Sequence, residues 1–190
     1  MNRSAALILT ALTVSTQGAL AAPAFDADGK LEFPKDYRDW IYLSSGLGMS
    51  YNAEPSGEQM FDNVFVDRDA YQAFLKSGTW PDGTEFVLEV REAKQNGSIN
   101  KTGHFQGAAM HREVHVKDSA RFKGGWAFFA FPTDQPAAMI PTTQECYSCH
   151  RAHGAVDTTF VQFYPTLLPV AEEKKTLSAG YRADEGKPAH

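Results

Sequence analysis

Two cysteines and a histidine near the C-terminal end of the chain have the spacing of a covalent haem site. Cys146, Cys149 and His150 occur in the run Cys-Tyr-Ser-Cys-His. Residues three apart lie on one side of a helical turn, so both thiols can add to the vinyl groups along one porphyrin edge. A neutral imidazole is a good axial ligand for iron. The spacing is that of c-type haem attachment, and it predicts one covalently bound haem c per chain with His150 as the metal ligand.

Other uses of a Cys-x-x-Cys pair fit this chain less well. A structural zinc site takes four ligands, and the chain has no cysteines besides these two. A redox dithiol belongs to a thioredoxin-like unit and has no need of the histidine that follows. A structural disulfide needs only the two thiols. The histidine, together with the export signal described next, favours haem attachment over these alternatives.

Residues 1–21 have the pattern of a secretory signal peptide. Arg3 provides a positive charge, residues 5–14 form a short apolar run, and Ala19-Leu20-Ala21 is an A-x-A cleavage site. The apolar run is too short to span a bilayer, so we expect cleavage near Ala21 and no membrane insertion afterwards. The predicted location is the periplasm, the compartment in which bacteria attach haem c.

The composition of the remaining chain is that of one domain of ordinary size. The whole chain has 23 Asp and Glu against 18 Lys and Arg, and no basic stripe or charge block occurs. Nucleic acid is therefore not an expected partner. We expect a haem domain at residues 22–177, with a loosely held lead-in at 22–33, and a flexible polar tail at 178–190.

Hydrophobic periodicity predicts several strands before the haem motif. Strands are expected at residues 61–66, 85–91, 111–117 and 125–131. A short helical turn is expected at 34–40, a helix with Asp67 as its N-cap at 67–76, a helix capped by Asp157 through 174, and loops at 44–57 and 94–103. The small mitochondrial-type cytochromes and the four-helix cytochromes are helical before or around their motif. This chain instead predicts an α+β fold, mainly an antiparallel β-sheet with short flanking helices, with the haem motif on a C-terminal helix or loop.

Several segments outside the haem motif form a block that is typical of one family. They are Tyr37-Arg38-Asp39-Trp40, Val64-Phe65-Val66-Asp67, Thr79 to Thr84, Val116-Lys117-Asp118, Gly125-Trp126-Ala127-Phe128 and Phe160 to Pro165. On these segments the chain resembles the cytochrome P-460 and cytochrome c′-beta family over about residues 31–170. The resemblance implies a mainly antiparallel sheet, a homodimer, and a five-coordinate haem with a proximal histidine and an open distal side.

One position separates the two branches of that family. In the P-460 branch, which oxidises hydroxylamine, a lysine on the strand after the Asp-Gly-Thr turn is bonded to the porphyrin rim. Leu88 occupies the matching place in this chain and has no amine. The resemblance therefore implies a c′-beta-like protein that binds NO or CO in an apolar distal pocket. It also suggests Phe61 as an aromatic cap over the iron, with ordinary core packing as the alternative.

Glu113 matches a glutamate that serves as the distal proton acceptor in the hydroxylamine-oxidising branch. Strand alternation predicts that His111, Glu113 and His115 share one face, which is either the haem side or a solvent side. A hydroxylamine-oxidising or peroxidase-like oxidoreductase with Glu113 as the catalytic base thus stays open. So does a six-coordinate electron-transfer cytochrome with a redox partner protein, for which Met110 or Met139 would be the second axial ligand.

Overall fold

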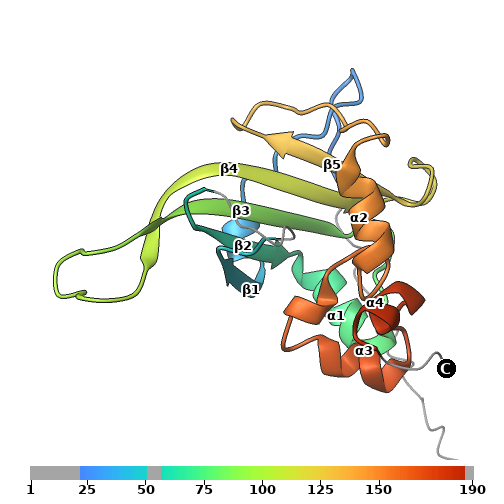
Figure 1. Ribbon diagram of the computed structural model, residues 1–190. Coiled ribbons are helices and arrows are strands. Elements are labelled where there is room, and N and C mark those ends of the chain that lie inside the picture. Colours follow the sequence, from blue (N-terminus) through green and yellow to red (C-terminus); the bar gives the residue numbers. More distant parts are fainter. Residues whose placement is uncertain (1–21, 51–56, 187–190) are drawn as a thin grey trace, which may run out of the picture.

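The computed structural model describes residues 22–50 and 57–186, so the predicted signal peptide lies outside the described residues. The described part contains a five-stranded antiparallel sheet with short helices beside it (Figure 1). The strands are β1 (Ile41–Leu47), β2 (Met60–Val66), β3 (Glu85–Lys94), β4 (Phe105–Lys117) and β5 (Trp126–Phe131). The helices are α1 (Arg68–Ser77), α2 (Glu145–His153), α3 (Leu168–Lys174) and α4 (Ala179–Asp184), with the 3-10 turns η1 (Tyr37–Asp39) and η2 (Val161–Phe163). The predicted α+β fold is confirmed.

Each strand pairs with its neighbours in sequence order, so the sheet is a simple meander. Val64 of β2 lies opposite Leu88 of β3, and Leu88 lies opposite Glu113 of β4. Directly opposed residues point to the same face of a sheet, and alternate residues point to opposite faces. Val64, Leu88 and Glu113 therefore form one row of side chains on a single face.

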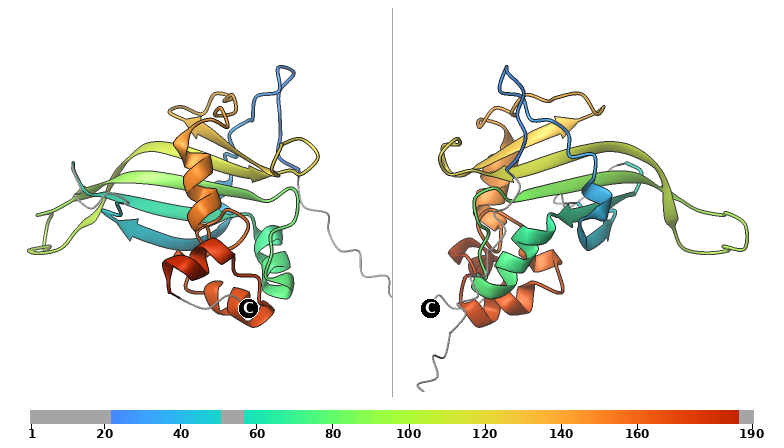
Figure 2. Two further views of the ribbon diagram at one scale, coloured as in Figure 1. Left: turned by 45° about the vertical axis from the view of Figure 1, so that its right-hand side comes forward. Right: turned by 180° about the vertical axis from the view of Figure 1, so that it is seen from behind.

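The opposite face of the sheet is covered by the N-terminal segment of the described chain. In Figure 2 this segment crosses the sheet in the view from behind. Leu31 is fully buried there, and its backbone exchanges two hydrogen bonds of 2.9 Å with Ala137. Phe33, Phe129 and Phe131 pack in the same cluster. The predicted loose lead-in at residues 22–33 is thus wrong, because Leu31 and Phe33 gain burial against the sheet.

The helices gather at the end of the sheet that α2 crosses (Figure 1). Asp67 caps α1, as predicted, by accepting a hydrogen bond of 2.7 Å from the amide of Ala70. Gly78 ends this helix in the left-handed conformation, with φ of 73°. The aromatic rings of Phe74 and Trp80 then pack against the sheet side chain Phe86.

Three local predictions need correction. The sequence predicted no strand before residue 61 and a loop from residue 44, whereas β1 covers Ile41–Leu47, because pairing with β2 supplies its backbone hydrogen bonds. Asp157 does not cap a helix; its φ is 50°, and the helix after it begins only at Leu168. Within the tail expected to be flexible at 178–190, residues 179–184 form α4, in which Tyr181 is buried in the core. Within residues 22–50 and 57–186, no helix has the length and apolar character to cross a membrane.

Glu85, the first residue of β3, predicts how stability depends on pH. Its side chain is 9% exposed, and burial, reinforced by Asp67 and Asp36, raises its pKa from 4.5 to about 8. Between these values the folded chain keeps a proton that the unfolded chain loses, so stability falls as the pH rises through this window. We expect Glu85→Gln to raise the unfolding midpoint at pH 8 and to change it little at pH 5.

Thermal unfolding at several pH values measures this effect. Glu172→Gln, which changes an exposed carboxyl, is the matched control and should leave the pH dependence as it is. An equal effect of Glu85→Gln at both pH values would contradict the prediction.

Candidate functional site

Helix α2 carries both cysteines and the histidine of the haem motif. Cys146 and Cys149 are free thiols, and each is partly buried. Burial is the largest influence on both and raises their pKa, so the thiols are protonated at neutral pH. Two neutral thiols one turn apart, followed directly by an imidazole, are the donor set that haem attachment requires.

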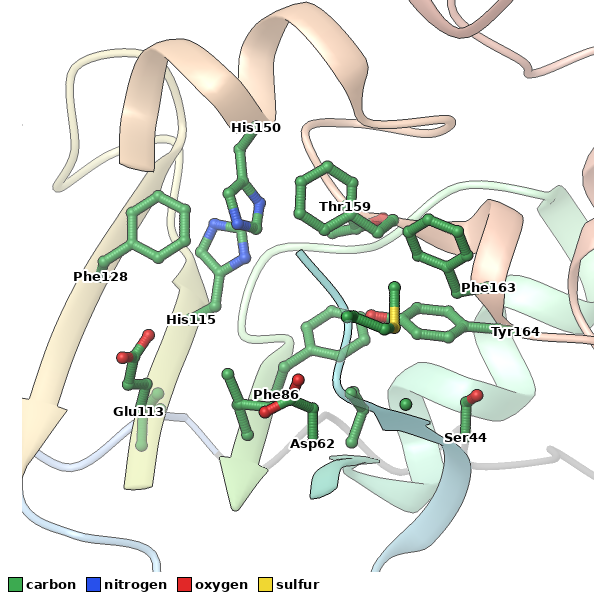
Figure 3. Close-up of a pocket in the computed structure, with 16 residues that line it drawn as sticks. Ser44, Asp62, Phe86, Glu113, His115, Phe128, His150, Thr159, Phe163 and Tyr164 are labelled. Atoms are coloured by element: carbon green, nitrogen blue, oxygen red, sulfur yellow. The ribbon is translucent and has the colours of Figure 1, made fainter. Parts of the chain in front are cut away.

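His150 points from α2 into the interior, and its ring is held by one hydrogen bond (Figure 3). Its Nδ1 lies 2.7 Å from the carbonyl oxygen of Thr158. Because a carbonyl only accepts, Nδ1 carries the proton, and Nε2 keeps its lone pair for a metal. Burial lowers the pKa of His150, which also favours the neutral ring. A hydrogen bond of this kind fixes the orientation of a ligating histidine.

A cavity of about 300 Å³ lies between His150 and the face of the sheet that carries Leu88 (Figure 3). Aromatic side chains supply much of its wall, namely Phe86, Phe128, Phe160, Phe163 and Tyr164. The ring centroids of Phe160 and Phe128 lie 4.2 Å and 4.7 Å from that of His150. A flat, apolar prosthetic group with a polar rim suits such walls.

His115 forms part of the wall next to His150. Its ring stacks on Phe128 with centroids 3.9 Å apart, and its centroid is 5.3 Å from that of His150. Burial, followed by the proximity of His150, lowers the pKa of His115 well below its usual value. Within the described part of the chain, its buried Nε2 has no hydrogen-bond partner. Sequence alternation predicted that His115 shares a face with Glu113, which is confirmed, but it did not show the contact with His150.

Two carboxylates, from the strands on either side of β3, lie in the floor of the cavity (Figure 3). Glu113 of β4 lines the cavity, and His111 Nε2 lies 3.6 Å from its Oε1. Asp62 of β2 also lines it, and its pKa is raised by burial and then by the negative charge of Glu113. Sequence reasoning missed Asp62, although alternation with Val64 on the predicted strand would have placed it on this face.

The apolar distal pocket that the resemblance implied is therefore an aromatic cavity with an acidic floor, to which Glu113 contributes. The structure also places Phe61 outside this cavity. Its neighbour Asp62 lines the cavity, so alternation directs Phe61 to the other face of β2 and corrects the expected aromatic cap. Met110 and Met139 are exposed and do not line the cavity, whereas Met49, in a segment expected to be a loop, does.

An antiparallel sheet that encloses an aromatic cavity with a Cys-x-x-Cys-His helix defines a haem-binding cytochrome. The chain belongs to the cytochrome P460 family, because the model of that family, described as Cytochrome P460, matches residues 34–161. The matched range includes the cavity floor and the haem motif, and it confirms the resemblance seen in the sequence. A search of curated proteins found no match.

The residues present fit a haem better than a bare metal ion. His150 offers one Nε2 toward an aromatic cavity, and two thiols lie on its own helix. Across residues 22–50 and 57–186, no cluster of three or more His, Cys, Asp or Glu side chains could hold a metal ion by itself.

Gly154 lets the chain return closely against His150 after α2, and this predicts the effect of a substitution. A Cβ at this position would lie 2.7 Å from the carbonyl oxygen of His150 and 2.8 Å from the Cα of Thr158. These are backbone atoms that cannot rotate away, so we expect Gly154→Ala to destabilise the fold by about 1–3 kcal/mol, as overpacking does. Denaturant unfolding measures the loss.

Gly107→Ala is the matched control. A Cβ there would lie 2.6 Å from Glu92 Oε2 and from Lys94 Cε, the far ends of flexible side chains, and 3.0 Å from Glu92 Cβ. Its cost should be smaller than that of Gly154→Ala, because the two closest atoms can move away. Equal stability of the two variants would contradict the close packing at Gly154.

Proposed function

We propose that this protein is an exported mono-haem c-type cytochrome that binds a small neutral ligand, NO or CO. Cys146 and Cys149 hold the haem through thioether bonds, and His150 is the protein ligand of the iron. The signal peptide pattern supports a periplasmic location. The observation that carries the proposal is Leu88 in the cavity floor, at the place where the hydroxylamine-oxidising branch is expected to have its cross-linking lysine.

The haem, when bound, supplies an iron that coordinates diatomic ligands and exchanges single electrons. The chain supplies the surroundings that select the ligand. Phe86, Phe160 and Tyr164 in the cavity wall exclude water. No lysine or arginine is among the described residues that line the cavity, so no fixed cation there attracts an anion.

The carboxylates of Asp62 and Glu113 add a charge criterion. A negative group near the ligand repels anions such as cyanide and azide, whereas NO and CO are neutral and feel little of this field. The pKa of Asp62 is raised first by burial and then by the negative charge of Glu113, and both effects disfavour further negative charge in this cavity. The acidic floor therefore favours neutral ligands.

A second candidate function is oxidation of hydroxylamine or reduction of peroxide, and Glu113 is the observation that favours it. Its carboxylate lines the cavity and lies near His111, so it could accept a proton from a bound substrate. A redox partner protein would have to remove the electrons that hydroxylamine releases, or supply the two electrons that peroxide reduction consumes. Leu88 argues against an extra porphyrin bond in such an enzyme, because leucine has no amine to form it.

A third candidate function is electron transfer by a six-coordinate haem. The structure changes the candidate for the second iron ligand from Met110 or Met139 to Met49. Met49 lines the cavity, whereas Met110 and Met139 do not. If Met49 supplied a second protein ligand to the iron, its sulfur would compete with small ligands. Met49 is therefore the side chain to remove when this reading is tested.

The resemblance also implies a homodimer, which we keep as a proposal. Tyr42 and Leu47 of β1 and Met110 of β4 are large hydrophobic side chains that are 53%, 41% and 52% exposed. Pairing of two copies would remove such side chains from water. Sedimentation velocity of the haem-loaded protein decides between one and two copies.

The ferrous absorption spectrum tests the proposed function. We expect a five-coordinate, high-spin spectrum that changes on addition of NO or CO, and an ordinary c-type pyridine haemochrome, since no amine modifies the porphyrin. A six-coordinate, low-spin spectrum in both oxidation states would contradict it. Restoration of the high-spin form by Met49→Ala would then identify Met49 as the sixth ligand.

Anion affinity tests the acidic floor. We expect Asp62→Asn and Glu113→Gln each to strengthen azide binding to the ferric protein about fivefold, because one nearby charge contributes on the order of 1 kcal/mol in a partly solvated pocket. Affinity for CO should stay within twofold. Asp134→Asn, a carboxylate outside the cavity, is the control. If neither substitution changed the azide affinity, the carboxylates would not select the ligand.

A further inference from the structure

The chain makes a strained turn directly after the haem helix. Asp157 and Thr158 have φ of 50° and 65°, in the left-handed region that side chains other than glycine rarely adopt. Val156 and Thr159 pair across the turn as an antiparallel bridge. We call residues 156–159 the Asp157 turn. A β-branched threonine in this region is costly, and such strain persists only where surrounding contacts over-determine it.

The side chain of Lys117, at the end of β4, supplies those contacts. Its Nζ lies 2.9 Å from Asp157 Oδ2 and also donates to the carbonyl oxygen of Trp80 at 2.6 Å. The backbone amide of Trp80 donates to the same Asp157 oxygen at 3.4 Å. One lysine thus ties the turn both to the sheet and to the segment before β3.

A second set of bonds holds the other side of the turn. The indole Nε1 of Trp80 donates to Thr159 Oγ1 at 2.9 Å, and this hydroxyl donates to the carbonyl oxygen of Val156 at 2.6 Å. Trp80 and Thr159 are both buried. Val156 and Thr159, the two ends of the turn, are therefore held without the ion pair between Lys117 and Asp157. The ion pair acts on the residues between these ends, Asp157 and Thr158.

The turn has one polar contact with the haem motif, from Thr158 to His150. The carbonyl oxygen of Thr158 is the acceptor, 2.7 Å from His150 Nδ1. A left-handed residue directs its carbonyl differently from an extended one, so the φ values of the turn decide whether this bond forms. A stronger acceptor at Nδ1 makes a ligating imidazole more basic.

We propose that Lys117 and Asp157 form a clamp that, through the Asp157 turn, aims the Thr158 carbonyl at His150 and so sets how strongly His150 donates to the haem iron. The inference rests on the proposed role of His150 as the iron ligand. Lys117 and Asp157 act as positioning residues, because neither lines the cavity. The side chains of Lys117 and Asp157 are 17% and 33% exposed, so the pair also stabilises the fold, and the test must use a readout that stability alone does not move.

The haem-loaded protein tests the clamp by resonance Raman spectroscopy of the ferrous iron–histidine stretch. Asp157→Asn removes the charge at nearly constant shape, and Asp157→Gly removes the side chain where glycine tolerates the positive φ. Lys117→Met removes the other partner. We expect all three to lower and broaden the stretching band and to raise the midpoint potential, because a less basic imidazole stabilises ferric iron less.

Asp134→Asn is the matched control. It breaks the 2.8 Å ion pair between Asp134 and Arg112. Arg112 lies on β4, as Lys117 does, but it packs over Phe33 on the opposite face of the sheet. Its band should match that of the unmodified protein. The double variant of Lys117→Met with Asp157→Asn should shift the band as far as either single variant does, because the pair acts as one unit.

The outcomes separate the clamp from the proposed function. A band that does not move in the Asp157 and Lys117 variants, or shifts that simply add in the double variant, would overturn the clamp. Failure of Asp157→Asn to fold or retain haem would also overturn it, because the pair would then be structural. If the unmodified protein were six-coordinate with no such band, the proposed function would fail, and the midpoint potentials of the same variants would still decide the clamp.

Discussion

The hydrogen bond from His150 Nδ1 to the carbonyl oxygen of Thr158 is the contact on which the site depends. It fixes the tautomer of the ring and directs Nε2 into the cavity. Gly154 makes it possible because the chain passes too close there for a Cβ. The left-handed Asp157 and Thr158 then bring the acceptor into place. The close approach at Gly154 and the left-handed turn after it thus hold the imidazole of His150 in one orientation and one tautomer.

Alternate residues along the same strands face two different environments, the aromatic cavity and the core on the opposite side of the sheet. Val87, Val116 and Phe129 face the cluster sealed by the N-terminal segment, whereas Leu88 and Glu113 face the cavity. A shift of one residue in the pairing would exchange the two sets and place the carboxylate in the sealed core. The pairing of Leu88 with Glu113 is therefore a constraint on the site as well as on the fold.

The chemistry of the cavity combines features that the sequence pointed to separately. Leu88 removes the amine expected of a hydroxylamine oxidiser, yet Glu113 keeps a proton acceptor in place. Asp62 adds a second carboxylate, which no sequence motif predicted. An aromatic wall with an acidic floor differs from a purely apolar gas pocket, because the carboxylates disfavour anionic ligands relative to neutral ones.

The sequence by itself determined the haem motif, four of the five strands and the family, because those depend on local spacing and on alternation along a strand. It also predicted that His111, Glu113 and His115 share a face, but it could not say whether that face meets solvent or cavity. Only the tertiary structure decided that, since the answer depends on where α2 and the residues after it pack. Tertiary packing also decided that Met49 lines the cavity and that Phe61 does not. It buried Leu31 of the lead-in and Tyr181. It also brought Lys117 into contact with Asp157, 40 positions away in the sequence. Contacts between distant segments leave no periodic signal in a single sequence, so packing alone revealed them.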